Sequence, residues 1–175
     1  MVAGRRIKTV AFVAILALTT FGALATASAG PSHPYYEEGE AKAKGVTSPA
    51  VAQALHNRAL AAWREGKYSE AEGLYKRALA IREQALGANH PDVGQTLHNL
   101  GLVHAAQRKY SEAEGVYKRA LAIRETALGA NHPDVGQTLN NLALVYADQS
   151  KHGGAEELYK RALAIREKAL GARKT

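Results

Sequence analysis

Apolar side chains recur with the period of an α-helix along most of this 175-residue chain. In the segment Pro91–Lys109, Val93 is followed after 4, 7, 8 and 11 positions by Leu97, Leu100, Gly101 and His104, which places these residues on one side of a helix. Strand signals are absent from the chain. The pattern therefore predicts an all-α fold with six helices: Pro49–Gly66, Ser69–Leu86, Pro91–Arg108, Ser111–Leu128, Pro133–Ser150 and Gly153–Leu170.

Residue types at the predicted helix ends support these boundaries. Pro91 suits a first helical position, because the N–H group that proline lacks has no partner there. Asp92 places a negative charge beside the positive end of the helix dipole. Gly87, Gly129 and Gly171 follow the second helix of each pair, where a left-handed backbone conformation commonly ends a helix.

A repeat of 42 residues organises these helices into pairs. Tyr68–Lys109 and Tyr110–Lys151 align without gaps and are identical at 35 of 42 positions. The phrase YKRALAIRE occurs three times, and NHPDVGQTL occurs twice. Neither helix of a pair can bury its apolar side alone, so the pairs must stack into a solenoid. We therefore expect one domain of three repeats, with the boundaries 48–89, 90–131 and 132–171.

The repeated unit resembles the tetratricopeptide repeat, in the 42-residue form of kinesin light chains and many bacterial proteins. The resemblance covers Ser48–Gly171 and implies a right-handed α–α superhelix. Two positions of the first repeat depart from the family pattern, with Arg58 in the leucine position and Ala62 in the tyrosine position. The matching positions are the small residues Ala59, Gly101, Ala143, Ala71, Ala113, Ala155, Ala78, Ala120 and Ala162, and the aromatic residues Tyr75, Tyr117 and Tyr159.

The resemblance also implies a concave face, lined by the first helix of each pair, that holds an extended peptide or a helix of a partner protein. Amide side chains suit this role, because they both donate and accept hydrogen bonds and can pair with a peptide backbone. Among them, we expect Asn99 and Asn141 above all to contact the ligand. The alternative is that these amides only solvate a helix or bond to the adjacent helix. The predicted lining residues are Gln53, His56, Asn57, Leu60, Gln95, His98, Asn99, Leu102, Gln137, Asn140, Asn141 and Leu144.

Catalytic and metal-binding signals are missing from the sequence. The chain has no cysteine, which excludes disulfides, zinc–thiolate sites and thiol nucleophiles. His90 and His132 recur in the links between repeats, but a metal needs several ligands that converge, and these links lie a full repeat apart. Helix capping explains them better. With no motif for hydrolase, zinc-protease or nucleotide-binding chemistry, we predict a non-enzyme without catalytic residues, metal or cofactor.

The N-terminal segment has the pattern of a secretory signal peptide, predicted over residues 1–29. Three basic residues among the first eight precede the uncharged apolar run Val10–Leu24, and Ala27-Ser28-Ala29 fits a cleavage site. The prediction is therefore export to the periplasm or secretion, and contact with a membrane only if the signal stays uncleaved as an anchor. Residues 30–47, rich in proline, glycine and mixed charge, are predicted to form a flexible linker, and residues 172–175 a short tail.

The charge of the chain favours a protein or peptide partner over a nucleic acid. Without the three basic residues of the signal, 20 basic and 16 acidic residues remain, so the net charge falls from +7 to +4. Basic residues alternate with glutamates along the second helices and form no stripe of one sign for DNA or RNA. An alternative function is a structural unit that forms homo-oligomers through uncapped repeat ends. It rests on Leu163 and Leu170, which no further predicted helix follows.

Overall fold

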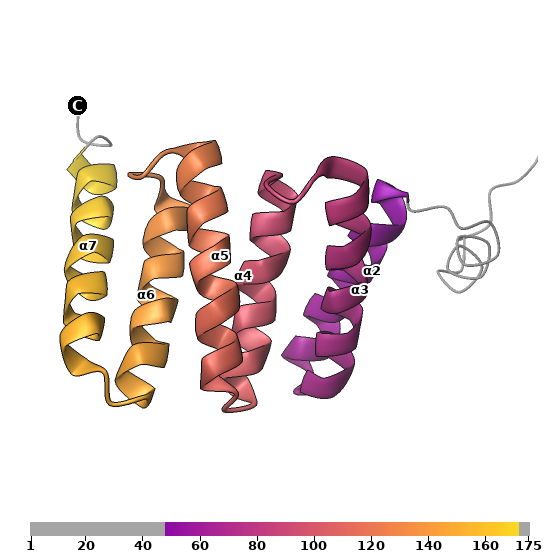
Figure 1. Ribbon diagram of the computed structural model, residues 1–175, viewed down its shortest axis with the longest axis horizontal. Coiled ribbons are helices and arrows are strands. Elements are labelled where there is room, and N and C mark those ends of the chain that lie inside the picture. Colours follow the sequence, from indigo (N-terminus) through magenta and orange to yellow (C-terminus); the bar gives the residue numbers. More distant parts are fainter. Residues whose placement is uncertain (1–47, 172–175) are drawn as a thin grey trace, which may run out of the picture. The chain divides into compact units, whose positions relative to one another are not determined.

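A computed structural model describes residues 48–171 of the chain, and these residues form six α-helices (Figure 1). The predicted signal peptide, linker and C-terminal tail lie outside the described residues. No strand occurs within 48–171. The helices are α2 (Pro49–Arg64), α3 (Tyr68–Leu86), α4 (Pro91–Ala106), α5 (Tyr110–Leu128), α6 (Pro133–Asp148) and α7 (His152–Gly171).

The helices pack as three successive pairs. The most extensive contacts join α2 to α3, α4 to α5 and α6 to α7, and each pair then packs on the next through α3–α4 and α5–α6. The backbones of successive first helices approach each other closely, whereas successive second helices within 48–171 meet only through side chains, such as the Glu83–Arg119 ion pair between α3 and α5. The first helices (α2, α4 and α6) are therefore the inner helices, and the second helices (α3, α5 and α7) are the outer helices. The predicted all-α solenoid of three helix pairs is confirmed.

Small residues let the two helices of each pair approach closely, as the family pattern implies. In the first repeat Ala59, Ala71 and Ala78 are completely buried and surround the ring of Tyr75, which is 1% exposed. In the second repeat Gly101 leaves even less room, because a Cβ at this position would lie 2.6 Å from the Tyr117 ring. The predicted packing positions are thus the positions at which the helices touch.

The inner helices end earlier than the sequence predicted. Their last predicted residues, Gly66, Arg108 and Ser150, instead lie in the turns and have positive φ angles of 75°, 59° and 61°. A left-handed residue cannot continue a right-handed helix, so each inner helix stops two residues before it. The predicted stops after the outer helices are confirmed at Gly87 and Gly129, whose φ angles are 89° and 88°. The third predicted stop is wrong, because Gly171 is still part of α7.

Histidine side chains cap the second and third inner helices. Nδ1 of His90 accepts a hydrogen bond from the backbone N–H of Asp92 at 3.2 Å, and His132 accepts one from Asp134 at 3.1 Å. A proline follows each histidine at the first helical position. The first N–H groups of a helix have no partner inside it, so this ring nitrogen stabilises the helix start. The capping role expected for these two histidines is confirmed.

Candidate partner-binding surface

Exposed glutamines occupy the same position on all three inner helices. Gln53, Gln95 and Gln137 follow one another at intervals of 42 residues, and each is exposed. Leu144, 51% exposed, lies two helical turns after Gln137 on α6 and adds an apolar contact area. Asn57 is exposed as well, whereas the predicted leucines Leu60 and Leu102 and asparagines Asn99 and Asn141 are half-buried. The inner face therefore presents amides next to leucines.

Two of the predicted lining residues are wrong, because the structure buries them. His56 is 4% exposed and His98 only 2% exposed. Each imidazole meets the tyrosine of its own repeat edge to face, with ring centroids 5.2 Å apart for His56–Tyr75 and 5.6 Å for His98–Tyr117. The next inner helix covers both rings, and Nδ1 of His98 lies 3.2 Å from the hydroxyl of Thr138 on α6. These histidines pack the repeats together and cannot contact a ligand on the inner face.

Burial controls the protonation of these histidines. It lowers the pKa of His56 to about 4, with the Arg82 guanidinium acting in the same direction. It lowers the pKa of His98 to about 3, where Arg124 has the same effect. Both rings are therefore neutral near pH 7, and a neutral imidazole can accept the hydrogen bonds that its neighbours offer.

The amides of Asn99 and Asn141 take part in packing between helices. Nδ2 of Asn99 lies 3.1 Å from Nε2 of His56, and the same side chain hydrogen-bonds to Tyr75. Asn141 forms the equivalent bond to Tyr117, whose pKa burial raises well above its usual value. These contacts correspond to the alternative that the sequence left open, in which the amides bond to neighbouring helices.

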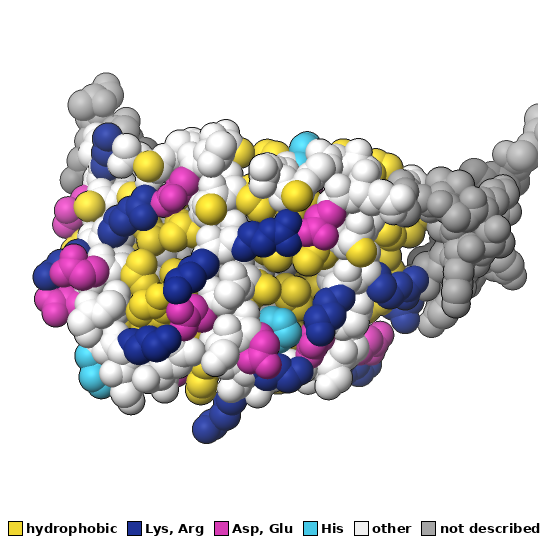
Figure 2. Space-filling model, viewed as in Figure 1, with side chains coloured by type: hydrophobic (Ala, Val, Ile, Leu, Met, Phe, Trp, Pro, Cys, Tyr) yellow, Lys and Arg dark blue, Asp and Glu magenta, His cyan; other side chains and the backbone are white. Residues whose placement is uncertain are grey.

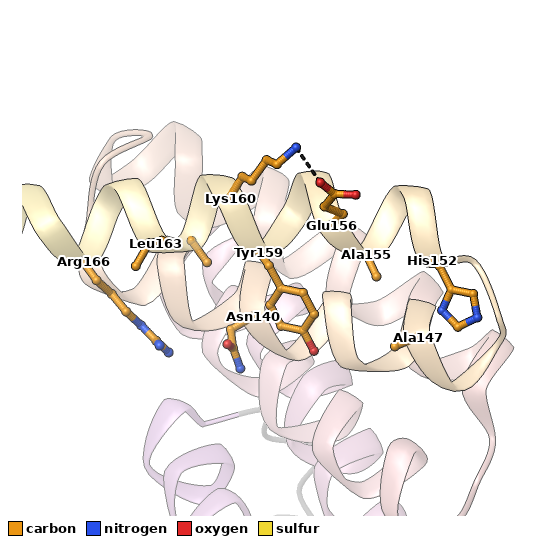
Figure 3. A pocket seen from close by; sticks show the side chains of 10 residues that line it. Asn140, Ala147, His152, Ala155, Glu156, Tyr159, Lys160, Leu163 and Arg166 are labelled. Atoms are coloured by element: carbon orange, nitrogen blue, oxygen red, sulfur yellow. Dashed lines mark ion pairs between the residues drawn. The ribbon is translucent and has the colours of Figure 1, made fainter.

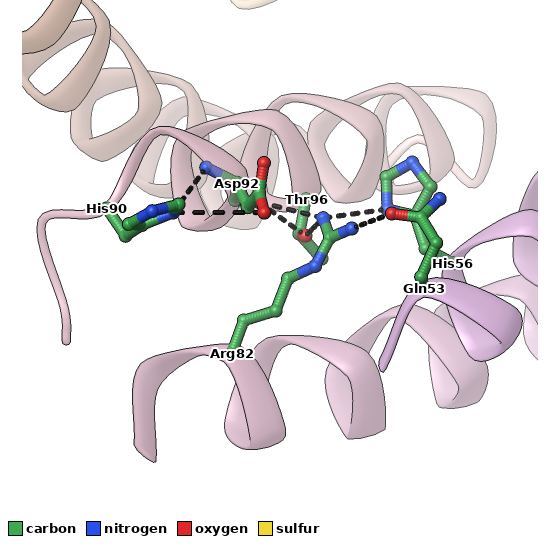
Figure 4. A network of polar contacts seen from close by, with 6 residues as sticks. All are labelled: Gln53, His56, Arg82, His90, Asp92 and Thr96. Atoms are coloured by element: carbon green, nitrogen blue, oxygen red, sulfur yellow. Dashed lines mark hydrogen bonds and ion pairs between the residues drawn. The ribbon is translucent and has the colours of Figure 1, made fainter. Parts of the chain in front are cut away.

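A buried arginine, which the sequence analysis missed, ties the first two repeats together (Figure 4). Arg82 of α3 is only 2% exposed. Its Nη1 donates to the Asp92 carbonyl oxygen at 2.9 Å and to the Thr96 hydroxyl at 2.7 Å, both on α4. Its Nη2 donates to Oε1 of Gln53 on α2 at 2.6 Å. One guanidinium thus joins α3 to both α2 and α4, and it orients the first glutamine of the inner face.

The same clamp recurs between the second and third repeats. Nη1 of Arg124 donates to the Asp134 carbonyl oxygen at 2.9 Å and to the Thr138 hydroxyl at 2.7 Å. The equivalent residue of the third repeat, Arg166, is exposed. A signal for this arginine exists in the sequence, because Arg82 continues the stripe of Ala71, Tyr75 and Ala78 at helical spacing.

Lysine–glutamate pairs cover the outside of the repeat junctions. Glu72 of α3 accepts from Lys76 at 2.6 Å and from Lys109, at the start of the next outer helix, at 2.7 Å. These lysines lower the pKa of Glu72 to about 2, and Lys118 and Lys151 do the same for Glu114. Basic and acidic side chains intermix on the face seen in Figure 2.

No group of three His, Cys, Asp or Glu side chains among residues 48–171 could hold a metal ion. None of the helices in this part of the chain combines the length and the apolar character that a membrane span requires. A cavity of about 550 Å³ lies on α6 and α7 and includes the predicted lining residue Asn140. Asn140 thus lies at the end of the stack and not in the middle of the inner row.

Stacked helix pairs with small residues at their contacts and a polar inner face define a helical-repeat protein of the interaction and assembly class. The tetratricopeptide repeat family model matches residues 50–126 and 96–168. The chain therefore belongs to the tetratricopeptide repeat family. Proteins built from this repeat are typically scaffolds without enzymatic activity. No curated protein sequence matches the chain significantly.

Solved structures with kinesin light chain-type repeats are similar to this chain. BtubC (BKLC) from P. vanneervenii has a TM-score of 0.71 and 29% identity, over 79% of this chain and 56% of BtubC. A putative kinesin light chain from Podosopora anserina, with nearly identical TPR-like repeats, has a TM-score of 0.60 and 26% identity, over 73% of this chain and 62% of that one. MamA, with a TM-score of 0.56 and 20% identity, shares the fold. The chain thus spans less than two thirds of the first two proteins.

Proposed function

We propose that this chain is an exported interaction module that binds an extended segment of a partner protein along its inner face. The observation that carries this proposal is the row of Gln53, Gln95 and Gln137, exposed at one position of three successive inner helices. An extended peptide offers one N–H and one C=O group at each residue, and a primary amide can form hydrogen bonds with both groups. A row of such amides therefore suits a backbone more than a particular side chain.

The hydrogen bonds of Gln53 support a preformed site in the first repeat. Arg82 orients Gln53 from beneath, and Nε2 of Gln53 donates to Oδ1 of Asn57 at 2.8 Å. A side chain already held in place loses less conformational entropy when a ligand binds. Each neutral hydrogen bond contributes only about 1 kcal/mol, so the affinity is spread over the three repeats, and the exposed Leu144 adds apolar contact.

Site-directed photocrosslinking in the cells that export the protein tests the inner face. A photoreactive amino acid in place of Gln137 is expected to form a crosslinked product that the same substitution at the exposed outer residue Gln84 does not form. Gln95→Ala combined with Leu144→Asp, in the chain that carries the crosslinker at 137, is expected to remove most of that product. Equal crosslinking from Gln137 and Gln84, or a product unaffected by the double substitution, would overturn the inner-face assignment.

Export is tested separately, so that its failure does not affect the binding proposal. The protein recovered from the envelope or the medium is expected to begin at Gly30, because Ala27-Ser28-Ala29 precedes that residue. N-terminal sequencing measures this directly. A protein that keeps Met1 and stays with the membrane fraction would show instead that the segment is an uncleaved anchor.

A further inference from the structure

The outward side of α7 carries a pocket of about 550 Å³ that no helix within residues 48–171 covers. Tyr159 and Arg166 of α7 point to the same side as Asn140 of α6, and all three side chains line the pocket (Figure 3). Leu163, which also lines the pocket, is 56% exposed. A second cavity of about 340 Å³ adjoins it and shares Arg166. Apolar surface and an exposed guanidinium therefore lie next to each other at this end of the stack.

The first two repeats show what fills the equivalent surface. In the second repeat, Leu142 and Val145 of α6 form a buried cluster with Ala113 and Tyr117 of α5. In the first repeat, Leu100 and Val103 of α4 pack in the same way on Ala71 and Tyr75 of α3. The pocket on the third repeat is lined by their counterparts, Ala155 and Tyr159. In both repeats, a leucine and a valine three residues apart on the next inner helix thus cover this surface.

The arginines of the first two outer helices, Arg82 and Arg124, also have equivalent partners. Arg82 and Arg124 each donate to a threonine hydroxyl and to the backbone carbonyl four residues before it, in the first turns of the covering helix. The threonine lies four residues before the leucine that fills the pocket. Arg166 stands at the equivalent place on α7 and lines both cavities there.

We infer that the outward side of α7 binds an amphipathic helix of a partner protein that carries Thr, Leu and Val at positions i, i+4 and i+7. The leucine and valine of this helix enter the pocket over Ala155 and Tyr159. Its threonine hydroxyl and first-turn carbonyl accept hydrogen bonds from Arg166. This binding site is distinct from the inner face. It binds a helix, whereas the inner face binds an extended segment.

A second copy of the chain is a poor occupant, because α2 does not carry this pattern. At the positions equivalent to Thr96, Leu100 and Val103 of α4, α2 has Ala54, Arg58 and Ala61. Arg58 pairs with Glu70 at 3.5 Å. Stacking α2 of one copy on α7 of another would therefore place a charged side chain in the apolar pocket and offer Arg166 no hydroxyl. The inner helices α4 and α6 are already packed within their own copy.

Titration of the full chain with a fluorescent peptide of residues 131–150, the α6 sequence, tests the inference by anisotropy. The peptide contains Thr138, Leu142 and Val145 and is expected to bind saturably in the micromolar range, gaining helix content. Arg166→Ala in the protein is expected to weaken binding about tenfold or more, because it removes hydrogen bonds from a charged donor. Lys168→Ala, an exposed change outside the pocket, is the matched control and leaves binding unchanged.

Peptide variants identify the groups that bind. Leu142→Arg, which copies the residue of α2 at that position, is expected to abolish binding. Thr138→Val is expected to make the effect of Arg166→Ala smaller, because only the backbone carbonyl then remains as an acceptor for the guanidinium. Binding unaffected by Arg166→Ala would overturn the inference, since the peptide would then be displacing α6 from α5. Light scattering provides a second test. A dimer of the chain alone that Leu163→Glu dissociates would overturn the inference in favour of a second copy.

Discussion

Acidification from pH 7 to pH 5 is expected to destabilise the repeats through buried histidines. Burial lowers the pKa of His104 as well, but the lowering is largest at His56 and His98. Burial lowers the pKa of His56 to about 4 and that of His98 to about 3, while an ordinary histidine has a pKa of 6.5. Below pH 6.5 the unfolded chain therefore binds protons that the folded chain excludes. Because the folded pKa lies below the unfolded one, stability is lost as the pH falls through this window.

The size of the effect follows from the two pKa values. Each excluded proton changes the free energy of unfolding by about 1.4 kcal/mol per pH unit. Between pH 7 and pH 5, each histidine is expected to remove about 2 kcal/mol, and the two together about 4 kcal/mol. Glu72 and Glu114 act in the same direction, but only as the pH falls from 4.5 towards their lowered pKa of about 2. The window above pH 5 therefore reports mainly on histidine.

Urea unfolding at pH 7 and pH 5, followed by circular dichroism, measures this difference. His56→Asn with His98→Asn is the test variant, because Asn140 fills the equivalent position of the third repeat. Its loss of stability between the two pH values is expected to be about 4 kcal/mol smaller than that of the wild type. Leu74→Val, which copies Val116, is a control for destabilisation without a change in titration. A double variant as sensitive to pH as the wild type would refute the reasoning.

Two further predictions concern single positions of the repeat. Gly101→Ala places a methyl group 2.6 Å from the buried Tyr117 ring, and crowding of about 1–3 kcal/mol exceeds the gain in helix propensity of about 1 kcal/mol. Thermal unfolding is expected to show a lower midpoint, and a higher one would contradict the packing argument. Arg108→Gly and Ser150→Gly relieve φ angles of 59° and 61° and are expected to stabilise the protein by about 1 kcal/mol each in urea unfolding. An unchanged free energy of unfolding would show that these turns are unstrained.

The fold was predictable because the repeat displays the packing positions several times. Ala71, Tyr75 and Ala78 share one side of the helix, and the same three residue types recur 42 positions later, so chance is excluded. The early ends of the inner helices could not be predicted from residue type at every repeat. Gly66 signals a left-handed turn, but the equivalent Arg108 and Ser150 do not.

The inner face was predictable only in part, because helical spacing does not show where the next repeat lies. His98 and Gln95 are three residues apart on α4, yet α6 covers His98 and leaves Gln95 exposed. Arg82 was missed because its residue type predicted exposure. A charged residue on an amphipathic helix is normally exposed, and only the carbonyl and hydroxyl of α4 make its burial favourable.

The near-identity of the junctions has a consequence for how the chain folds. α3 and α5 differ at two positions, and α6 carries the threonine and leucine with which α4 binds α3. During folding α6 can therefore dock on α3 and loop out a whole repeat. The larger loop costs only about 2 kcal/mol more in closure entropy than the native link. Refolding is thus expected to show a slow phase, in which chains with a skipped repeat must open before the stack completes, and at high concentration the same exchange joins two chains.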